Sequence, residues 1–476
     1  MNPENPAQKS GFRSLPKTYW IAIIFEFFER GSYYGMMSIL SVYLTDQLNF
    51  SKEGVGVIKG TIQPLLYFLP IISGAVADKL GYRKMLMVAF TLLSGGYFLT
   101  FGSDSYVTVF LALVVMGIGA GSFKPVISGT IAKLTDEKTN TLGFGIFYWS
   151  INLGAFLFPM FLVPYLKSFS WSYVILASSI TTGLMLLPTI FLYKEPPRAE
   201  IKKEPLLVII KDVFSKMLMV IKDWRYILFI FIYSGFWILY FQMFDSVLWY
   251  VNLFVDPSAL ENFVFNTTGI TWRFGVEHVT VINALTIILL QLVVSSIVSK
   301  TKPLPTIITG ITLGSIGMGI LAINTNIWIF IIGITIFSIG EMTAHPKYLS
   351  YLALIAPPDK KATYTGFGFL YGFFGSFVGG YLGAFLYVRF VDNPMIEFIR
   401  ETLIVKSSNI VLAHNVKIGE ALQAAYKIGL TKAEVALHAN TSELWLIFSG
   451  IGVLTIIGLL LYQKLIAAPG IRENRK

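Results

Sequence analysis

The stretch Gly74-Ala-Val-Ala-Asp78-Lys-Leu-Gly81-Tyr-Arg83-Lys84 decides the fold of this 476-residue chain. It lies between two long apolar segments, so it is expected to form a short loop at a membrane surface. Its glycines permit a tight turn and close contact between helices. Asp78 is expected to cap a helix end, and the basic pair is expected to hold the cytoplasmic face as a gate loop.

The composition around this loop is that of a polytopic helical membrane protein. The chain is 55% hydrophobic and 13% charged, whereas a soluble protein has about 25% charged residues. Cysteine is absent, which excludes disulfides and thiol chemistry. The net charge of +10 is better explained by basic loops at a membrane than by nucleic-acid binding.

Twelve apolar segments are long enough to cross a bilayer, which takes about 20 residues. They are predicted near 18–44, 54–78, 84–103, 106–132, 141–166, 171–193, 225–253, 277–300, 304–323, 327–356, 362–391 and 440–466. Basic residues collect in alternate loops: the N-terminus, Lys79/Arg83/Lys84, Lys133/Lys138, 194–225, Lys300/Lys302, Lys360/Lys361 and Arg472/Arg475/Lys476. This alternation predicts that both termini are cytoplasmic.

The basic stretch 194–224 divides the chain into two sets of six helices. The predicted parts are an N-terminal bundle 1–193, an amphipathic cytoplasmic linker 194–224, a C-terminal bundle 225–466 and a cytoplasmic tail 467–476. The C-terminal bundle contains a polar extracellular insertion, 392–439. Its composition predicts short amphipathic helices in Glu420–Lys427 and Thr431–His438, with a lid or a spacer as the simplest role.

Three charges lie within the first apolar segment, in the run F-E-F-F-E-R-G-S-Y-Y-G from Phe25 to Gly35. Each charge in a membrane-spanning helix costs about 3 kcal/mol, so such residues are functional candidates. Glu26 and Arg30 are four residues apart and share a helix face, with Glu29 beside it. The pattern predicts a partly neutralised cluster facing a wet interior, and the alternative is a structural ion pair between packed helices.

The loop at 74–84 resembles the G-x-x-x-D-x-x-G-x-[RK]-[RK] signature of the major facilitator superfamily, in the place where that family has it. The resemblance implies twelve helices in two six-helix halves that alternate access around a site near the bilayer midplane.

A closer resemblance is to the proton-coupled oligopeptide transporters of that superfamily. Glu26-x-x-Glu29-Arg30-x-x-Tyr33-Tyr34-Gly35 looks like their E-x-x-E-R-x-x-x-Y-G segment. Matching motifs for the fourth, fifth and tenth helices are Gly117–Ser128, Phe147–Gly154 and Gly340–Pro346. The central linker is too short and too charged to hold the two extra helices of many bacterial members.

This resemblance implies proton coupling through Glu26, Glu29, Arg30 and Lys124. Protonating either glutamate would free a cation to meet a substrate anion, and deprotonation toward the cytoplasm would restore the pairing. Lys124 has an alternative role as an anchor near a helix end. Its place in mid-segment, before Pro125, favours the functional role.

The same resemblance implies a cargo pocket. Its residues are the pocket tyrosines Tyr33, Tyr34 and Tyr67, the amine-binding residues Asn152, Asn283 and Glu341, and Lys124. Aromatic packing is the alternative for the tyrosines, and interhelical hydrogen bonding is the alternative for the two asparagines. His345 lies one turn beyond Glu341 and is a minor candidate for a titrating pair.

Three positions depart from the family pattern. Met37 replaces an arginine, Phe241 replaces the glutamate of the seventh helix, and Gly368 replaces a pocket tryptophan. The arginine and the glutamate form a gate and a proton site in the family, and losing both avoids a stranded buried charge. Asp245, one turn beyond Phe241, is a minor candidate to replace the missing acid.

The predicted function is proton-coupled symport of di- and tripeptides, and the alternative is proton-coupled symport of another organic solute. No nucleotide-binding, serine-hydrolase or zinc motif indicates an enzyme, and no signalling domain indicates a sensor. Sodium coupling stays open on charge alone. The expected partners are the cargo, protons and the lipid bilayer of a bacterial inner membrane, with no cofactor, no metal, no nucleic acid and a monomeric state.

Overall fold

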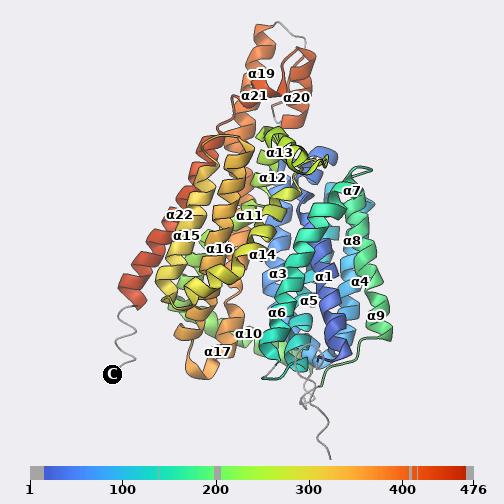
Figure 1. Cartoon of the computed structure of the whole chain (residues 1–476), viewed down its shortest axis with the longest axis vertical. Coiled ribbons are helices and arrows are strands. Elements are labelled where there is room, and N and C mark those ends of the chain that lie inside the picture. Colours follow the sequence, from blue (N-terminus) through green and yellow to red (C-terminus); the bar gives the residue numbers. More distant parts are fainter. Residues whose placement is uncertain (1–14, 138, 198–204, 407–409, 415, 468–476) are drawn as a thin grey trace, which may run out of the picture. The chain divides into compact units, whose positions relative to one another are not determined.

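The computed structural model describes residues 15–137, 139–197, 205–406, 410–414 and 416–467, and its regular structure is helical (Figure 1). Eleven of these helices are long and apolar enough to cross a membrane. The twelfth is α1 (Lys17–Met37), which has 21 residues and carries the three charges of the first segment. The predicted all-helical fold with twelve spans is confirmed. The two chain ends and residues 198–204 of the linker lie outside the described residues.

The chain forms two compact units, and each is described here by itself. Unit 1 comprises residues 1–36 and 65–218, and unit 2 comprises residues 37–64 and 219–476. The segment 37–64 contains α2 (Leu40–Val42), η2 (Tyr43–Gln47) and the first part of α3 (Lys52–Leu80). Unit 2 thus includes a segment from the N-terminal part of the chain, and the domain boundaries near 193 and 225 stay a prediction.

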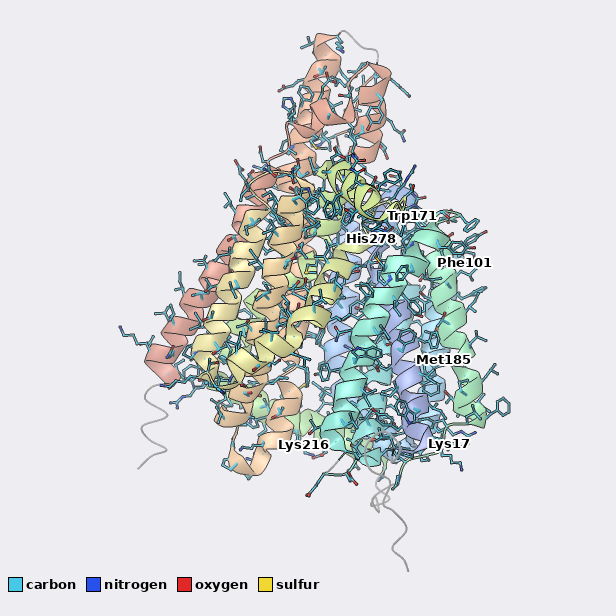
Figure 2. All side chains as sticks on the ribbon, in the orientation of Figure 1. Lys17, Phe101, Trp171, Met185, Lys216 and His278 are labelled. Atoms are coloured by element: carbon cyan, nitrogen blue, oxygen red, sulfur yellow. The ribbon has the colours of Figure 1, made fainter. Side chains whose placement is uncertain are left out.

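Unit 1 is built around α1, the second part of α3 and the helices that follow. These are α4 (Tyr82–Phe101), α5 (Tyr106–Leu134), α6 (Asn140–Leu157), η3 (Phe158–Leu162), α7 (Val163–Lys167), α8 (Ser172–Leu184), α9 (Leu186–Phe191) and α10 (Leu206–Lys222), which unit 1 contains as far as Leu218. Lys17, at the start of α1, and Trp171, before α8, lie at opposite ends of this unit (Figure 2). α10 lies within the predicted linker 194–224.

Unit 2 contains the remaining helices. They are α11 (Trp224–Gln242), α12 (Ser246–Phe254), α13 (Ser258–Thr268), α14 (His278–Ser299), α15 (Pro303–Ile320), α16 (Ile327–Ile355), η4 (Pro358–Lys360), α17 (Lys361–Phe367), α18 (Leu370–Tyr387), η5 (Val388–Asp392), α19 (Asn393–Val405), α20 (Ile418–Lys427), α21 (Lys432–Ala436), α22 (Thr441–Tyr462) and η6 (Gln463–Ala467). The seventh span is broken between α11 and α12. α15 and α16 approach closely, because a Cβ atom on Gly317 would lie 2.6 Å from the carbonyl oxygen of Gly333.

The insertion after the eleventh span begins as a continuation of that span. α18 passes through the π-helical turn η5 directly into α19, and α19, α20 and α21 form a group beyond the other helices of unit 2 (Figure 1). The two helices expected in the insertion are present as α20 and α21. A capping box of Thr431 and Glu434 begins α21, which explains where that helix starts.

Candidate functional site

The charged cluster of α1 lies in unit 1 and is buried. Arg30 donates from Nε to Oε2 of Glu29 at 2.5 Å and from Nη2 to Oε1 at 2.7 Å. Oε1 of Glu26 lies 3.6 Å from Nε of Arg30, where the two interact as an ion pair without a hydrogen bond. The three side chains are at most 4% exposed. One carboxylate is therefore held tightly by the arginine and the other loosely.

Lys124 belongs electrostatically to the same cluster. It lies inside α5, followed by Pro125, and so does not anchor a helix end. It interacts with the charges of Glu26, Glu29 and Arg30, and its Nζ lies 5.1 Å from the ring centre of Tyr67. In the part of the chain that the structure describes, its ammonium makes no hydrogen bond. Its donors therefore remain available to an anionic ligand.

The candidate tyrosines of unit 1 contact the cations of this cluster. The guanidinium of Arg30 lies 5.0 Å from the ring centre of Tyr33, within the range of a cation–π interaction. Tyr34 packs edge-on against Tyr33 at 5.4 Å, and Tyr67 receives Lys124. The structure brings all three rings to the charged cluster.

Asn152 behaves differently from the other candidates of unit 1. Its Nδ2 donates to the carbonyl oxygen of Tyr148, one turn back in α6, at 2.9 Å. The interhelical hydrogen bond that we considered for this residue is absent among the described residues. Its amide oxygen and the second hydrogen of Nδ2 are the groups through which it can bind a ligand.

Asn283 and Glu341, the two candidates of unit 2, contact each other. Nδ2 of Asn283 in α14 donates to Oε2 of Glu341 in α16 at 3.0 Å and to Oγ of Ser338 at 2.9 Å. The amide orients a carboxylate that has no cationic partner among the described residues. Such a carboxylate can accept hydrogen bonds from an ammonium group.

His345 does not form the expected pair with Glu341. Its ring lies among aromatic rings, with centroids 5.3 Å from Trp237 and 5.4 Å from Tyr371. Its Nδ1 is buried without a hydrogen-bond partner among the described residues. One helical turn puts the two residues over the same face of α16, but the histidine packs against α11 and α18 instead.

Asp245 is paired with a residue that the sequence analysis missed. Its Oδ1 lies 3.2 Å from Nζ of Lys59, and the two side chains are 3% and 1% exposed. A signal for Lys59 was present, because a lysine inside an apolar segment is expensive in a membrane. The predicted segment 54–78 contains it, but nothing in the sequence indicated its partner.

The three departures from the family pattern are accommodated by packing. Met37 and Phe241 are buried, with 2% and 3% exposure. Sδ of Met37 lies 3.7 Å from Nζ of Lys59, and Phe241 packs near Trp237 at 6.1 Å. A Cβ atom on Gly368 would clash with Cδ1 of Leu352, so a larger side chain requires rearrangement there.

In the loop between α3 and α4, Asp78 has different partners from those expected. Asp78 does not cap α4; its Oδ1 accepts hydrogen bonds from Lys133 at 3.0 Å and from Tyr82 at 3.0 Å. The first amides of α4 are capped by Glu195, whose carboxylate accepts from the backbone of Tyr82 at 2.6 Å and of the next residue at 3.0 Å. A carboxylate at this helix N-terminus is favoured by the helix dipole.

The rest of the predicted gate loop consists of Gly74, Gly81, Arg83 and Lys84. Gly81 has φ 101°, a backbone conformation that favours glycine. A Cβ atom on Gly74 would lie 3.4 Å from Cβ of Pro125 of α5, which is an ordinary van der Waals contact, so the packing there has room for a small side chain. Arg83 donates to the carbonyl oxygens of Thr189 and Ile190 at the end of α9, and Lys84 is exposed. The loop thus ties α3, α4, α5 and α9 together.

Comparison with known proteins agrees with this architecture. The model of the Major Facilitator Superfamily matches residues 20–380. Dipeptide and tripeptide permease B of Photorhabdus luminescens is 30% identical over 199 residues, which are 41% of this chain and 40% of the permease. The match thus spans less than half the length of that relative.

Solved structures share the fold at low identity. A POT family transporter in complex with 5-aminolevulinic acid has a TM-score of 0.69 at 20% identity, covering 96% of this chain and 98% of that one. The nucleoside transporter NupG also has a TM-score of 0.69, at 14% identity, covering 94% of this chain and 100% of that one.

The chain belongs to the Major Facilitator Superfamily, a superfamily of transporters. Within it, the permease match and the motifs both point to similarity with peptide transporters.

Proposed function

We propose that this protein is a proton-coupled symporter that imports di- and tripeptides by alternating access. The observation that carries the proposal is the buried cluster of Glu26, Glu29 and Arg30 with Lys124 in electrostatic range. Two carboxylates and two cations in a membrane interior need a compensating function, because buried charges are costly. The permease similarity supports a peptide as cargo.

Glu26 is the carboxylate best placed to accept the proton. Glu29 accepts two hydrogen bonds from Arg30, whereas Glu26 forms the longer ion pair with Arg30 at 3.6 Å. Protonating Glu26 removes one negative charge from the field around Lys124. Lys124 then attracts the carboxylate of a cargo more strongly, which couples proton binding to cargo binding.

The two units supply complementary recognition groups. In unit 1, Lys124 offers unused donors for a carboxylate, beside the ring of Tyr67. In unit 2, Glu341 offers a carboxylate oriented by Asn283 for an amine. A short peptide carries both an amine and a carboxylate at neutral pH, and each set of residues suits one of these two groups.

Symport of another organic solute is the second candidate, and the departures from the family pattern favour it. Met37 leaves no arginine for the cargo carboxylate, and Phe241 leaves no acid in the seventh span at the family position. A similar fold was solved with 5-aminolevulinic acid bound. Asn283 and Glu341 suit an amine, so the solute in this second candidate is one that carries an amine.

The cellular setting completes the proposal. The protein resides in a bacterial inner membrane with both termini in the cytoplasm, as the basic loops indicate. It acts as a monomer, and the proton gradient is its driving force in place of a cofactor.

Uptake into proteoliposomes tests the proposal. An inward proton gradient and a membrane potential are imposed, and labelled di-alanine and tri-alanine are offered with a peptide mixture as competitor. Accumulation above the external concentration that a protonophore abolishes is the expected result. No uptake of either peptide by folded protein would move the assignment to another solute.

A further inference from the structure

The insertion after the eleventh span encloses a cavity together with neighbouring parts of unit 2. The cavity has a volume of about 1110 Å³, slightly above the usual range for small-molecule pockets, about 300–1,000 Å³. Its walls come from α19 and α20, from η5 and α12, and from the turn between η2 and α3, all of which belong to unit 2. None of the proposed cargo residues lines it, so the proposed function leaves this cavity without a role.

Polar contacts hold the walls of this cavity in place. The ammonium of Lys417, just before α20, donates to the carbonyl oxygen of Asn49. Asn49 has φ 55°, a left-handed conformation that asparagine adopts more readily than most residues. Nζ of Lys432 donates to the carbonyl oxygen of Asn252 at 3.0 Å, and Nδ2 of Asn252 donates to Oδ2 of Asp46 at 2.8 Å. The insertion is thus attached to η2, α3 and α12, and the cavity has a defined shape.

A buried ion pair forms another part of the wall. Lys52 donates to the two carboxylate oxygens of Asp392 at 2.6 and 2.8 Å. Its ammonium also lies 5.5 Å from the ring centre of Trp249, and all three residues line the cavity. The two charges satisfy each other, so this pair builds the wall and is not a group that a ligand would engage.

Three other charged residues of the wall have no hydrogen bond or ion pair among the described residues. They are Glu53 in the first turn of α3, Arg389 in η5 and Glu420 in the first turn of α20. By contrast, Glu397 and Arg400, which also line the cavity, form an ion pair with each other at 3.4 Å. Two carboxylates and one guanidinium can therefore contact a ligand without breaking an existing bond.

The rest of the wall includes apolar side chains, namely Phe50, Leu253, Ile396, Val416 and Leu422. Apolar walls with a few charged groups are typical of sites for small molecules. The charges of both signs select among ligand classes. A polyanion would be repelled by the two carboxylates, and a cation without an anionic group would leave Arg389 unpaired. A short zwitterionic peptide matches the wall, because it carries an ammonium, a carboxylate and side chains.

We propose that this cavity is a second peptide-binding site, on the face of the protein that the basic loops indicate to be extracellular. Arg389 binds the carboxylate of the peptide, and Glu53 and Glu420 bind its ammonium. The site holds peptide on the face from which import begins. The choice of a peptide as ligand rests on the proposed function, whereas the cavity and its unpaired charges do not.

A single cysteine can report binding, because the chain has no cysteine of its own. Gln423 lines the cavity from α20 and is exposed, so Gln423→Cys reacts with a maleimide unless a ligand covers it. Leu437→Cys is the matched control, since Leu437 is 84% exposed and is not part of the wall. The labelling rate is measured in detergent with increasing tri-alanine, with amine-acetylated tri-alanine and with carboxyl-amidated tri-alanine.

Tri-alanine should slow the labelling of Gln423→Cys and leave that of Leu437→Cys unchanged. Adding Arg389→Gln should raise the concentration of tri-alanine needed for half-protection about three- to fivefold, as expected for one solvent-exposed ion pair. The value for the amidated peptide should stay the same. Glu53→Gln with Glu420→Gln should weaken protection by tri-alanine and not by the acetylated peptide. No protection of Gln423→Cys, or equal effects on the capped and uncapped peptides, would overturn the proposal.

A variant of the cargo residues separates direct protection from an indirect effect. Lys124→Gln should weaken cargo binding and leave the protection of Gln423→Cys unchanged. Loss of protection in Lys124→Gln would show that the peptide acts from the cargo residues, and would overturn the second site.

The labelling needs neither a gradient nor transport, so it also separates this inference from the proposed function. Protection by tri-alanine in a protein that accumulates no peptide in proteoliposomes would support the second site and count against the symport. Accumulation of peptide without protection of Gln423→Cys would support the symport and overturn the second site.

Discussion

Replacing the two glutamates of α1 one at a time should have different effects. Glu29→Gln should mainly lower the stability of the protein, and Glu26→Gln should mainly abolish proton coupling. In Glu29→Gln, the buried Arg30 loses the charge that it contacts at 2.5 and 2.7 Å. Removing one partner of a buried ion pair costs about 3–5 kcal/mol. The glutamine oxygen can still accept one hydrogen bond, so we expect the lower end, about 3 kcal/mol.

Glu26→Gln should be far milder for stability. Glu26 lies 3.6 Å from Arg30 without a hydrogen bond, and glutamine has nearly the same shape. We expect a loss of about 1 kcal/mol, the scale of one ordinary hydrogen bond. Because this variant resembles the protonated state, it should exchange peptide across the membrane yet fail to accumulate it under a proton gradient.

Thermal unfolding in detergent and two transport assays check both variants. The melting temperature should fall clearly in Glu29→Gln and only slightly in Glu26→Gln. Counterflow of labelled di-alanine should persist in Glu26→Gln while gradient-driven accumulation is lost. A larger destabilisation in Glu26→Gln, or full accumulation by it, would refute the assignment of the tightly and the loosely held carboxylate.

Three further changes probe other parts of the account. Lys124→Gln should raise the KM for di-alanine about 10- to 100-fold, as expected for the loss of a hydrogen bond to a charged group. The KM for a dipeptide whose carboxylate is capped as an amide should change little. Equal effects on the two KM values would contradict a contact between Lys124 and the carboxylate. Glu341→Gln should weaken exchange of di-alanine more than Asn283→Ala does, since the asparagine only orients the carboxylate. The reverse order in a counterflow assay would exclude Glu341 as the group that binds the cargo amine. Gly81→Ala should lower the free energy of unfolding by about 1–2 kcal/mol because the residue has a positive φ. The melting temperature should fall, and an unchanged melting temperature would show that the turn relaxes.

The helix spans and the first charged cluster could be predicted because both are local properties. A segment of apolar residues specifies its own helix, and the predicted spans lie within a few residues of the observed ones. The spacing of Glu26 and Arg30 fixes their common face on α1. What spacing could not show is that Glu29, next in sequence to Arg30, is its close partner, because this depends on side-chain rotamers.

Contacts between distant segments could not be predicted from the sequence. Lys59 and Asp245 meet only because segment 37–64 packs within unit 2, and this depends on tertiary structure. The same holds for Lys52 at the start of α3, which is buried against Asp392. Glu195, rather than Asp78, caps α4, since the chain after α9 returns to that helix end.

Proton movement driven by peptide tests the central claim of the account most directly. Proteoliposomes with no initial pH difference enclose a pH-sensitive dye, and a concentrated solution of di-alanine is added outside. The account predicts that the interior acidifies with the parent protein and that this acidification is absent with Glu26→Gln, which still exchanges labelled di-alanine. Peptide entry without acidification in the parent, or equal acidification with Glu26→Gln, would contradict proton coupling through the α1 cluster.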